Sequence, residues 1–399
     1  MWEERININE ITEIRAKTSV FLGVGAINKI NDIASILASK DYKRVVVVTG
    51  KSSHIKTGAW DVVKKALDNN NIQYVIYSKI TPNPTVDQVD EATRMALDFG
   101  ANAVIAIGGG SPIDAAKSVA ILMAYPDKNC RDLYEYKFAP EKAAPLVAIN
   151  LTHGTGTEVD RFAVVTIPEK EFKPAIAYDC IYPMYSIDDP ALMTGLPSEQ
   201  TLYVTVDALN HVVEACTTKA ANAFSILTAK ETVRLIAKYL PEAVKNPNDL
   251  RARYYLLYAS LIAGISFDNG LLHYTHALEH PLSAVKPELA HGLGLSMLLP
   301  AVVKHIYPAS GEILADVLSP ILPGLKGTPD EAQKAFDGLR SWLAGIGIKS
   351  TLKDEGFTEN DVDKLTDLAF ETPSLGLLLS MAPVEATREM LSSIYRDSI

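Results

Sequence analysis

Residues 101–124 read ANAVIAIGGGSPIDAAKSVAILMA. The apolar run at 103–107 is typical of a strand buried on both faces of a sheet. Three glycines follow, and after them an Ala-rich apolar pattern that predicts a helix. A strand, a glycine turn and a helix in this order form the repeating unit of a parallel sheet with right-handed crossovers.

The same unit recurs on the N-terminal side of this stretch. RVVVVTG at 44–50 and IQYVIYS at 72–78 predict further strands, each followed by a helical pattern. Near SIDDPALMTGLP, residues 186–197, the β-branched runs stop and the chain reads almost wholly as helices. A chain of 399 residues also exceeds the size that one core usually supports. We therefore predict an α/β nucleotide-binding domain with a parallel sheet over residues 1–187 and an all-α helical domain over residues 188–399.

Charge and composition indicate the cellular compartment and exclude some classes of binding partner. A net charge of −10 argues against a nucleic-acid partner or an anionic membrane surface, which require clustered Lys and Arg. The three cysteines, Cys130, Cys180 and Cys216, are widely spaced and form no CxxC pair, which is typical of a reducing compartment. The N-terminus lacks the apolar region of a signal peptide, and no stretch approaches the roughly 20 apolar residues of a membrane span. The sequence therefore predicts a soluble, cytoplasmic protein with neither a nucleic-acid nor a membrane partner.

Histidines are concentrated in HYTHALEHPLSAVKPELAH, which begins at His273 and ends at His291. Four of the eight histidines in the chain lie there, and two of them share the spacing of one helical turn. Upstream, DALNHVVEA places Asp207 and His211 at the same spacing. One carboxylate and several imidazoles from separate elements indicate a metal site with mixed oxygen and nitrogen ligands. The alternative is a set of core or solvated histidines.

Two glycine-rich loops indicate a nucleotide site. GGGSPIDAAK, residues 108–117, follows a buried strand and opens a helix, whose N-terminus offers free N–H groups to a pyrophosphate. It is not the GxGxxG fingerprint, and a tight strand-to-helix turn explains it equally well. THGTGTEVDRF, residues 152–162, is a second loop of this kind after the strand LVAIN, and an ordinary loop is its alternative.

Taken together, these pieces resemble the iron-containing (group III) alcohol dehydrogenase family over essentially the full length. The matching motifs occur in the family's order: FLGVG, GGGSPIDAAK, THGTGTEVDRFAVVT, DDPALMTGLP, DALNHVVEA and AGISFDNGLLHYTHALEHPL…AHGLGLSMLLP. The resemblance implies a dehydroquinate synthase-like fold, with the metal and the substrate in the cleft between the two domains. It also implies a homo-oligomer, most simply a dimer.

The resemblance assigns roles to the histidine cluster. The family's metal ligands correspond to Asp207, His211, His276 and His291. His280 corresponds to a further active-site histidine that is not a ligand, and it would pass the proton to solvent. The connection before His291 is one residue longer than is usual in the family. The resemblance implies Fe(II), although these ligand types also suit zinc and other divalent metals. His273 replaces a small residue, and either lines the substrate pocket or sits on the helix.

The resemblance also assigns cofactor contacts. They correspond to Gly50, Lys51, Ser52, Asn83, Gly108, Gly109, Gly110, Ser111, Asp114, Thr152, Thr155, Gly156 and Lys173. His153 stands where the family has a small residue, so it changes the local pocket. Members that prefer NAD carry an acidic residue at the position of Gly50, where its carboxylate would repel a 2′-phosphate. Glycine removes that repulsion, and Lys51 and Ser52 can bind a phosphate, so we predict NADP(H) over NAD(H). The alternative for Lys51 is a solvated loop residue.

The implied activity is that of a metal-dependent alcohol dehydrogenase, or aldehyde reductase. It would transfer a hydride between NADP(H) and a small primary alcohol or aldehyde. A zinc-dependent polyol dehydrogenase and a dehydroquinate synthase-like lyase are alternatives on the same fold. The lyase handles a highly charged substrate and should need several cationic residues, yet Lys286 is the only one between His273 and His291. A non-catalytic metal- and nucleotide-binding protein is a more distant alternative, which the ligand set and His280 disfavour.

Overall fold

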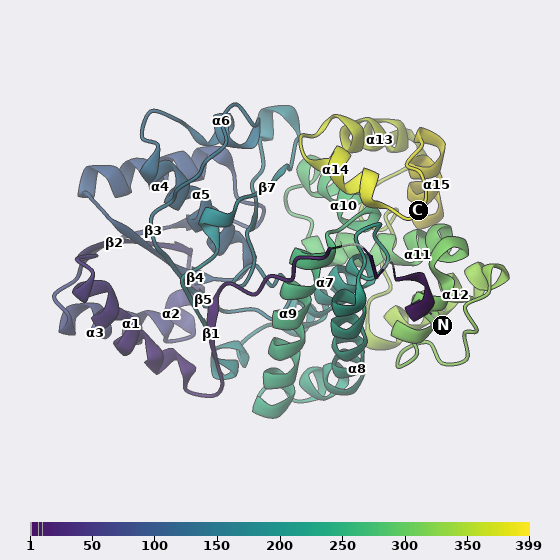
Figure 1. The fold of residues 1–399 in the computed structure, drawn as a ribbon, viewed down its shortest axis with the longest axis horizontal. Helices are drawn as coiled ribbons and strands as arrows, with labels where there is room; N and C mark the ends of the chain where they lie inside the picture. Colours follow the sequence, from purple (N-terminus) through teal and green to yellow (C-terminus); the bar gives the residue numbers. More distant parts are fainter. Residues whose placement is uncertain (1, 7, 10) are drawn as a thin grey trace. The chain divides into compact units, whose positions relative to one another are not determined.

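The computed structural model describes residues 2–6, 8–9 and 11–399, and the chain forms two compact units (Figure 1). The sheet unit consists of Ala16–Leu196 together with Pro247–Leu261. The helical unit consists of Met1–Arg15, Pro197–Asn246 and Ile262–Ile399.

The sheet unit is built on six parallel strands in the order β1-β8-β5-β4-β2-β3. Their bounds are β1 Ser19–Leu22, β2 Arg44–Gly50, β3 Gln73–Ile80, β4 Ala103–Gly108, β5 Leu146–Asn150 and β8 Tyr185–Asp188. A two-stranded antiparallel ribbon, β6 Phe162–Val164 with β7 Ala175–Ala177, accompanies the sheet. Every residue of β4 and β5 is buried, as expected for central strands of a parallel sheet.

Helices cover both faces of this sheet. Alternate residues of β2 divide between two cores: Val46 and Val48 belong to one, and Val45 and Val47 to the other. The first core also takes up α4 (Val86–Phe99) and α5 (Gly110–Ala124), and the second takes up α1 (Ile30–Ser39) and α3 (Ala59–Asn69). Figure 1 shows the two helix pairs on opposite sides of the strands. The short helices α2 (Ser53–Lys56) and α6 (Cys130–Tyr134) complete the unit's α-helices before α9.

The helical unit contains α7 Ser198–Ala215, α8 Ala223–Lys245, α10 Tyr274–Val285, α11 His291–Val317, α12 Ala332–Ile346, α13 Val362–Glu371, α14 Leu375–Met381 and α15 Arg388–Ser398. Helix α9, Leu250–Gly270, belongs to both units, since its first part lies in the sheet unit and its remainder in the helical unit. Among the described residues, no single helix has the length and hydropathy to cross a membrane. Helices α9 and α10 have the required length and hydropathy only when taken together, and the chain bends by 107° at the break between them.

The predicted fold class, a parallel α/β unit with an all-α unit, is confirmed. The domain boundary expected at residue 187 stays a prediction. In the structure the sheet unit continues to Leu196, and it also takes Pro247–Leu261 from the second half of the chain. Helical periodicity cannot show the second feature, because α9 is one continuous helix across the division at Leu261.

Candidate metal and cofactor sites

Three helices of the helical unit carry the predicted metal ligands. Asp207 and His211 lie one turn apart on α7, His276 lies on the first turn of α10, and His291 is the first residue of α11. Potential ligand atoms of Asp207, His276 and His291 all lie within 4.8 Å of one another. The Nε2 atom of His211 is 3.4 Å from Oδ1 of Asp207. The structure therefore brings all four predicted ligands together.

A glycine allows α11 to begin close to α7. A Cβ atom on Gly292 would lie 2.0 Å from the carbonyl oxygen of Tyr203 on α7, a distance no side chain tolerates. Glycine at this position therefore permits the backbone of α11 to touch that of α7. This contact places His291, the preceding residue, beside Asp207.

Two buried atoms at the centre of this cluster lack a hydrogen-bond partner. They are Oδ1 of Asp207 and Nε2 of His276, which lie 3.6 Å apart, too far for a hydrogen bond. A buried carboxylate oxygen without a partner is costly, and a cation would satisfy both atoms at once. The ring of His211 stacks on that of His276, with centroids 4.6 Å apart, and on Phe267 at 4.5 Å. The residues present therefore fit a divalent metal ion.

Charge at the centre of the cluster also favours a cation. Burial would raise the pKa of the Asp207 carboxyl, but the imidazoles of His211, His276 and His291 lower it to about 2. Burial would lower the pKa of His276, but the carboxylates of Glu214 and Asp207 raise it to about 9. Two carboxylates therefore attract positive charge to this position, either a proton or a metal ion.

Two glutamates that the sequence analysis did not single out orient the histidines. Glu214 on α7 and Glu279 on α10 are both fully buried. One carboxylate oxygen of Glu214 contacts Nδ1 of His276, and the other accepts hydrogen bonds from the backbone N–H groups of His273 (2.9 Å), Thr275 (2.9 Å) and His276 (3.3 Å). Glu279 contacts Nδ1 of His291 in the same way. Each Nδ1 is thereby fixed and Nε2 is left to bind a metal.

Replacing Glu214 by Gln is expected to weaken the metal affinity by roughly 10–100-fold, because an outer carboxylate no longer fixes and polarises the His276 ring. Equilibrium dialysis against Fe(II) or Zn(II) measures this loss. A matched control is Glu231→Gln on α8, where a half-buried glutamate pairs with Arg234. Metal affinity in Glu214→Gln equal to that of the wild type would contradict the orienting role.

His280 lies one turn after His276 on α10 and is buried. Its ring centroid is 5.9 Å from that of His291 and 6.5 Å from that of His276. Potential ligand atoms of Glu279, His280 and His291 form a second group within 4.8 Å. His280 is thus a neighbour of the predicted ligands, and His291 is common to both groups.

His273 has a structural role at the start of α10. Its Nδ1 accepts a hydrogen bond from the backbone N–H of Tyr274 at 2.6 Å, and its Nε2 lies 2.8 Å from Oγ1 of Thr217. Because Nδ1 accepts, the ring proton resides on Nε2 and is donated to the threonine. Burial lowers the pKa of His273 to about 4, so the ring is neutral. Of the two interpretations of His273, the structure supports the one that places it on the helix, as its N-cap.

The predicted diphosphate loop lies at the carboxyl end of β4 in the sheet unit. Gly108 ends the strand, Gly109 caps α5, and Gly110 and Ser111 begin the helix. A Cβ atom on Gly109 would lie 2.7 Å from the Thr152 side chain, and one on Gly110 would lie 2.6 Å from that of Thr155. The second predicted loop therefore packs directly on the first, over the N-terminus of a 15-residue helix suited to an anion.

Polar side chains of α5 hold the second loop in place. Asp114 accepts hydrogen bonds from Oγ1 of Thr157 (2.6 Å) and from the backbone N–H of Val164 (3.0 Å). Lys117 is fully buried and donates to Thr157, to the side chain and carbonyl of Asp160 and to the carbonyl of Phe162. Asp114 therefore anchors the loop, and a direct contact of Asp114 with the cofactor stays a prediction.

The remaining predicted cofactor residues lie on loops of the same unit. Gly50 ends β2, and Lys51, which is exposed, and Ser52 follow it. Asn83 lies on the loop after β3 with a left-handed backbone, φ 51°, which Asn tolerates better than most residues. Lys173, before β7, is buried. Burial raises the pKa of the Asp114 carboxyl, and the positive charge of Lys173 partly opposes that rise.

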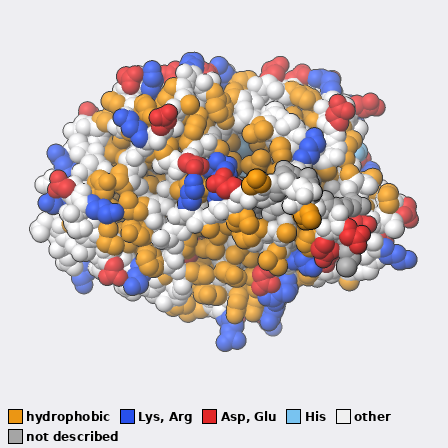
Figure 2. Space-filling view, in the orientation of Figure 1, with side chains coloured by type: hydrophobic (Ala, Val, Ile, Leu, Met, Phe, Trp, Pro, Cys, Tyr) orange, Lys and Arg blue, Asp and Glu red, His pale blue; other side chains and the backbone are white. Residues whose placement is uncertain are grey.

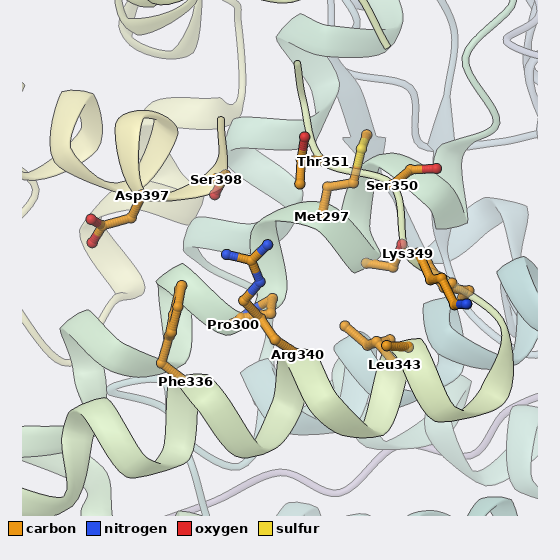
Figure 3. A pocket seen from close by; sticks show the side chains of 13 residues that line it. Met297, Pro300, Phe336, Arg340, Leu343, Lys349, Ser350, Thr351, Asp397 and Ser398 are labelled. Atoms are coloured by element: carbon orange, nitrogen blue, oxygen red, sulfur yellow. The ribbon is translucent and has the colours of Figure 1, made fainter. Parts of the chain in front are cut away.

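A pocket of about 110 Å³ in the helical unit is separate from these sites (Figure 3). It lies among α11, α12 and α15, with Met297 and Arg340 in its lining, and none of the predicted site residues lines it. The surface carries no basic patch on the face drawn in Figure 2, where the described cationic and acidic side chains are interspersed.

The whole chain matches known proteins. The family model described as iron-containing alcohol dehydrogenase matches residues 17–190, and that of the C-terminal part of the same family matches residues 201–399. The long-chain primary alcohol dehydrogenase of Thermoanaerobacter ethanolicus is 62% identical over 398 residues and 100% of both chains. The 1,3-propanediol dehydrogenase of Klebsiella pneumoniae is 33% identical, over 95% of this chain and 96% of that one.

Solved structures agree with these relatives. NADH-dependent butanol dehydrogenase A from Thermotoga maritima superposes with a TM-score of 0.89 at 29% identity, over 98% of each chain. A sulfoacetaldehyde reductase from Bifidobacterium kashiwanohense, in complex with NAD⁺, superposes with a TM-score of 0.82 at 26% identity, over 98% of this chain and 99% of that one. The resemblance inferred from the sequence is confirmed, and the chain belongs to the iron-containing alcohol dehydrogenase family.

Proposed function

We propose that the protein transfers a hydride reversibly between NADP(H) and a primary alcohol or aldehyde. The observation that carries this proposal is the buried cluster on α7, α10 and α11, in which Asp207 and His276 present unpartnered atoms to a common point. The proposed metal ligands are Asp207, His211, His276 and His291. Fe(II) is the proposed ion, as in the family's description, and such an ion when bound supplies Lewis-acid polarisation of the substrate oxygen.

The side chains around the ligands have defined tasks in this proposal. Glu214 and Glu279 hold the rings of His276 and His291 in one orientation, so that the ligand set is preorganised before anything binds. Burial of Asp207 and His211 keeps the site dry, which strengthens every electrostatic interaction in it. NADP(H) when bound supplies the hydride donor or acceptor.

His280 is the proposed proton carrier. As alcohol is oxidised, the hydroxyl proton must leave the site, and an imidazole next to the ligand cluster can accept it and release it. His280→Ala is expected to lower kcat for alcohol oxidation by roughly 100-fold near neutral pH, where the imidazole can accept the proton, with a smaller loss at high pH, where hydroxide can accept it instead, while the metal content stays unchanged. Metal analysis and a pH profile measure both effects. Loss of the metal together with activity would make His280 a ligand, as its proximity to Glu279 and His291 also allows.

The preference for NADP(H) is supported by the residues at the carboxyl end of β2. Gly50 offers no carboxylate, and the exposed ammonium of Lys51 follows it directly. Contacts of the cofactor with Gly108–Ser111, Thr152, Thr155 and Gly156 are proposed on the packing of the two loops over the start of α5. Gly50, Lys51, Ser52, Asn83, Asp114 and Lys173 complete the proposed cofactor site.

A primary alcohol or aldehyde is proposed as the substrate because the relative at 62% identity is named as a long-chain primary alcohol dehydrogenase. The lyase alternative gains no support from the ligand region. Its single lysine, Lys286, is already paired with Glu355 at 2.8 Å. A cytoplasmic homodimer is also proposed. The three free cysteines agree with a reducing compartment, and the dimer rests on the family resemblance.

The test is an assay of the anaerobically purified protein after reloading with Fe(II). Butanal-dependent oxidation of NADPH and of NADH is measured in parallel. Turnover with a strong preference for NADPH is the expected result. Equal or faster turnover with NADH would overturn the cofactor preference alone. Absence of turnover with either cofactor, across several aldehydes and with Zn(II) as well, would overturn the proposed function.

A further inference from the structure

A buried histidine–arginine pair joins the second cofactor loop to helix α9 within the sheet unit. His153 and Arg253 are both fully buried, and Nη1 of Arg253 donates a hydrogen bond to Nε2 of His153 at 2.9 Å. Nε of Arg253 donates to the carbonyl of Pro247 at 3.0 Å. A guanidinium is always a donor, so Nε2 of His153 carries no proton and the ring is neutral.

Burial of this pair is costly unless both partners are present. A guanidinium that leaves water must recover its hydrogen bonds from the protein. The neutral imidazole of His153 accepts one of these hydrogen bonds. Burial and the neighbouring charge of Arg253 lower the pKa of His153 to about 3, so the acceptor is retained throughout the working pH range.

His153 lies between the two residues that touch the diphosphate loop. Thr152 packs against Gly109 and Thr155 against Gly110, at positions where a Cβ atom would be within 2.7 Å. Asp114 and Lys117 hold the far part of the loop, from Thr157 onward. The hydrogen bond between His153 and Arg253 holds the near part. A small residue at position 153 could not make this contact.

We infer that the buried pair His153–Arg253 positions Thr152 and Thr155 over the start of α5, and thereby sets the affinity for the pyrophosphate group of the dinucleotide. Both are positioning residues, because they act through the loop. The inference rests on the proposed cofactor site. The pair also explains why a large polar residue is accommodated at position 153. His153 accepts a hydrogen bond from Arg253, which lies in the first turns of α9, and these turns belong to the sheet unit.

The test is a fluorescence titration with NADPH that yields Kd directly, independent of turnover. His153→Ala is expected to raise Kd at least tenfold, while kcat at saturating NADPH changes less than threefold, because the ligand cluster on α7, α10 and α11 is untouched. His153→Gln is expected to restore Kd to within about threefold of the wild type, since its amide oxygen can accept from Arg253. His305→Ala, on α11 in the helical unit, is the control and should leave Kd within twofold.

If His153→Ala does not fold because the buried Arg253 has lost its histidine acceptor, the double variant His153→Ala/Arg253→Met replaces it, since it removes both partners. It too is expected to raise Kd at least tenfold. Folded variants with Kd within twofold of the wild type would overturn the inference. So would a Kd that remains raised in His153→Gln to the level of His153→Ala. A wild-type protein that binds neither NADPH nor NADH would instead overturn the proposed function.

Discussion

Replacing Asp207 by Ala is expected to lower kcat/KM by at least about 1000-fold and to remove the bound metal. Asp207 contributes the one carboxylate of the proposed ligand set, and its Oδ1 lies 3.4 Å from His211 and 3.6 Å from His276. Without that carboxylate, the proposed ligand set consists of three imidazoles and contains no anionic ligand. Loss of Lewis-acid stabilisation is worth several kcal/mol, and about 4 kcal/mol corresponds to about 1000-fold in rate.

The measurement combines metal analysis with steady-state kinetics on protein reloaded with Fe(II). Asp316→Ala on α11 is a matched control, because Asp316 is only half-buried and its carboxylate pairs with Lys230 and accepts a hydrogen bond from Trp2, not from any proposed ligand. It should retain full metal content and activity. Circular dichroism confirms that Asp207→Ala is folded. A folded Asp207→Ala protein with one equivalent of iron and wild-type turnover would show that the cluster does not hold the catalytic metal.

The second large effect is expected at the end of β2. Gly50→Asp should lower kcat/KM for NADPH about 100-fold and change that for NADH less than tenfold, so that the preference reverses. The new carboxylate would face a 2′-phosphate, and two negative charges about 4 Å apart repel by several kcal/mol even when partly screened. A Cβ atom fits at this position, because it would lie 3.4 Å from the carbonyl oxygen of Ile80 and farther from all other groups.

Lys51→Ala provides the companion measurement. It should weaken NADPH binding several-fold and leave NADH binding unchanged, since it removes one exposed cation and adds no repulsion. A wild-type protein that already prefers NADH would contradict the interpretation of Gly50. The names of the NADH-dependent butanol dehydrogenase and the NAD-dependent methanol dehydrogenase show that NAD(H) is used among similar proteins. Kinetics of the wild type and of both variants with NADPH and NADH therefore decide which cofactor this chain prefers.

Much of the fold follows from local patterns. The β-branched run of β2 and the apolar run of β4 predict buried parallel strands because both faces of each must be apolar. The spacing of Asp207 and His211 predicts that they share one helix face, and the structure places both in the buried cluster. These inferences succeed because they depend on the period of one element alone.

The parts that could not be predicted depend on contacts between elements. Glu214 and Glu279 resemble ordinary helical glutamates, which are mostly exposed, and only the packing of α7, α10 and α11 buries them beside His276 and His291. Glu214 does share the face of Asp207 and His211, because it follows His211 by three residues, and that spacing is the one local signal for its place in the site. Likewise, nothing local in the sequence pairs His153 with Arg253, one hundred residues away.

The measurement that tests the central claim most directly is anomalous diffraction from crystals of the Fe(II)-loaded protein, recorded on both sides of the iron absorption edge. The account predicts one strong peak among Asp207, His211, His276 and His291, with each ligand atom about 2.0–2.2 Å from it. A peak coordinated by Glu279 and His280, with Asp207 and His211 unliganded, would contradict the proposed ligand set. No peak at this cluster in protein that turns over butanal would contradict the metal mechanism itself.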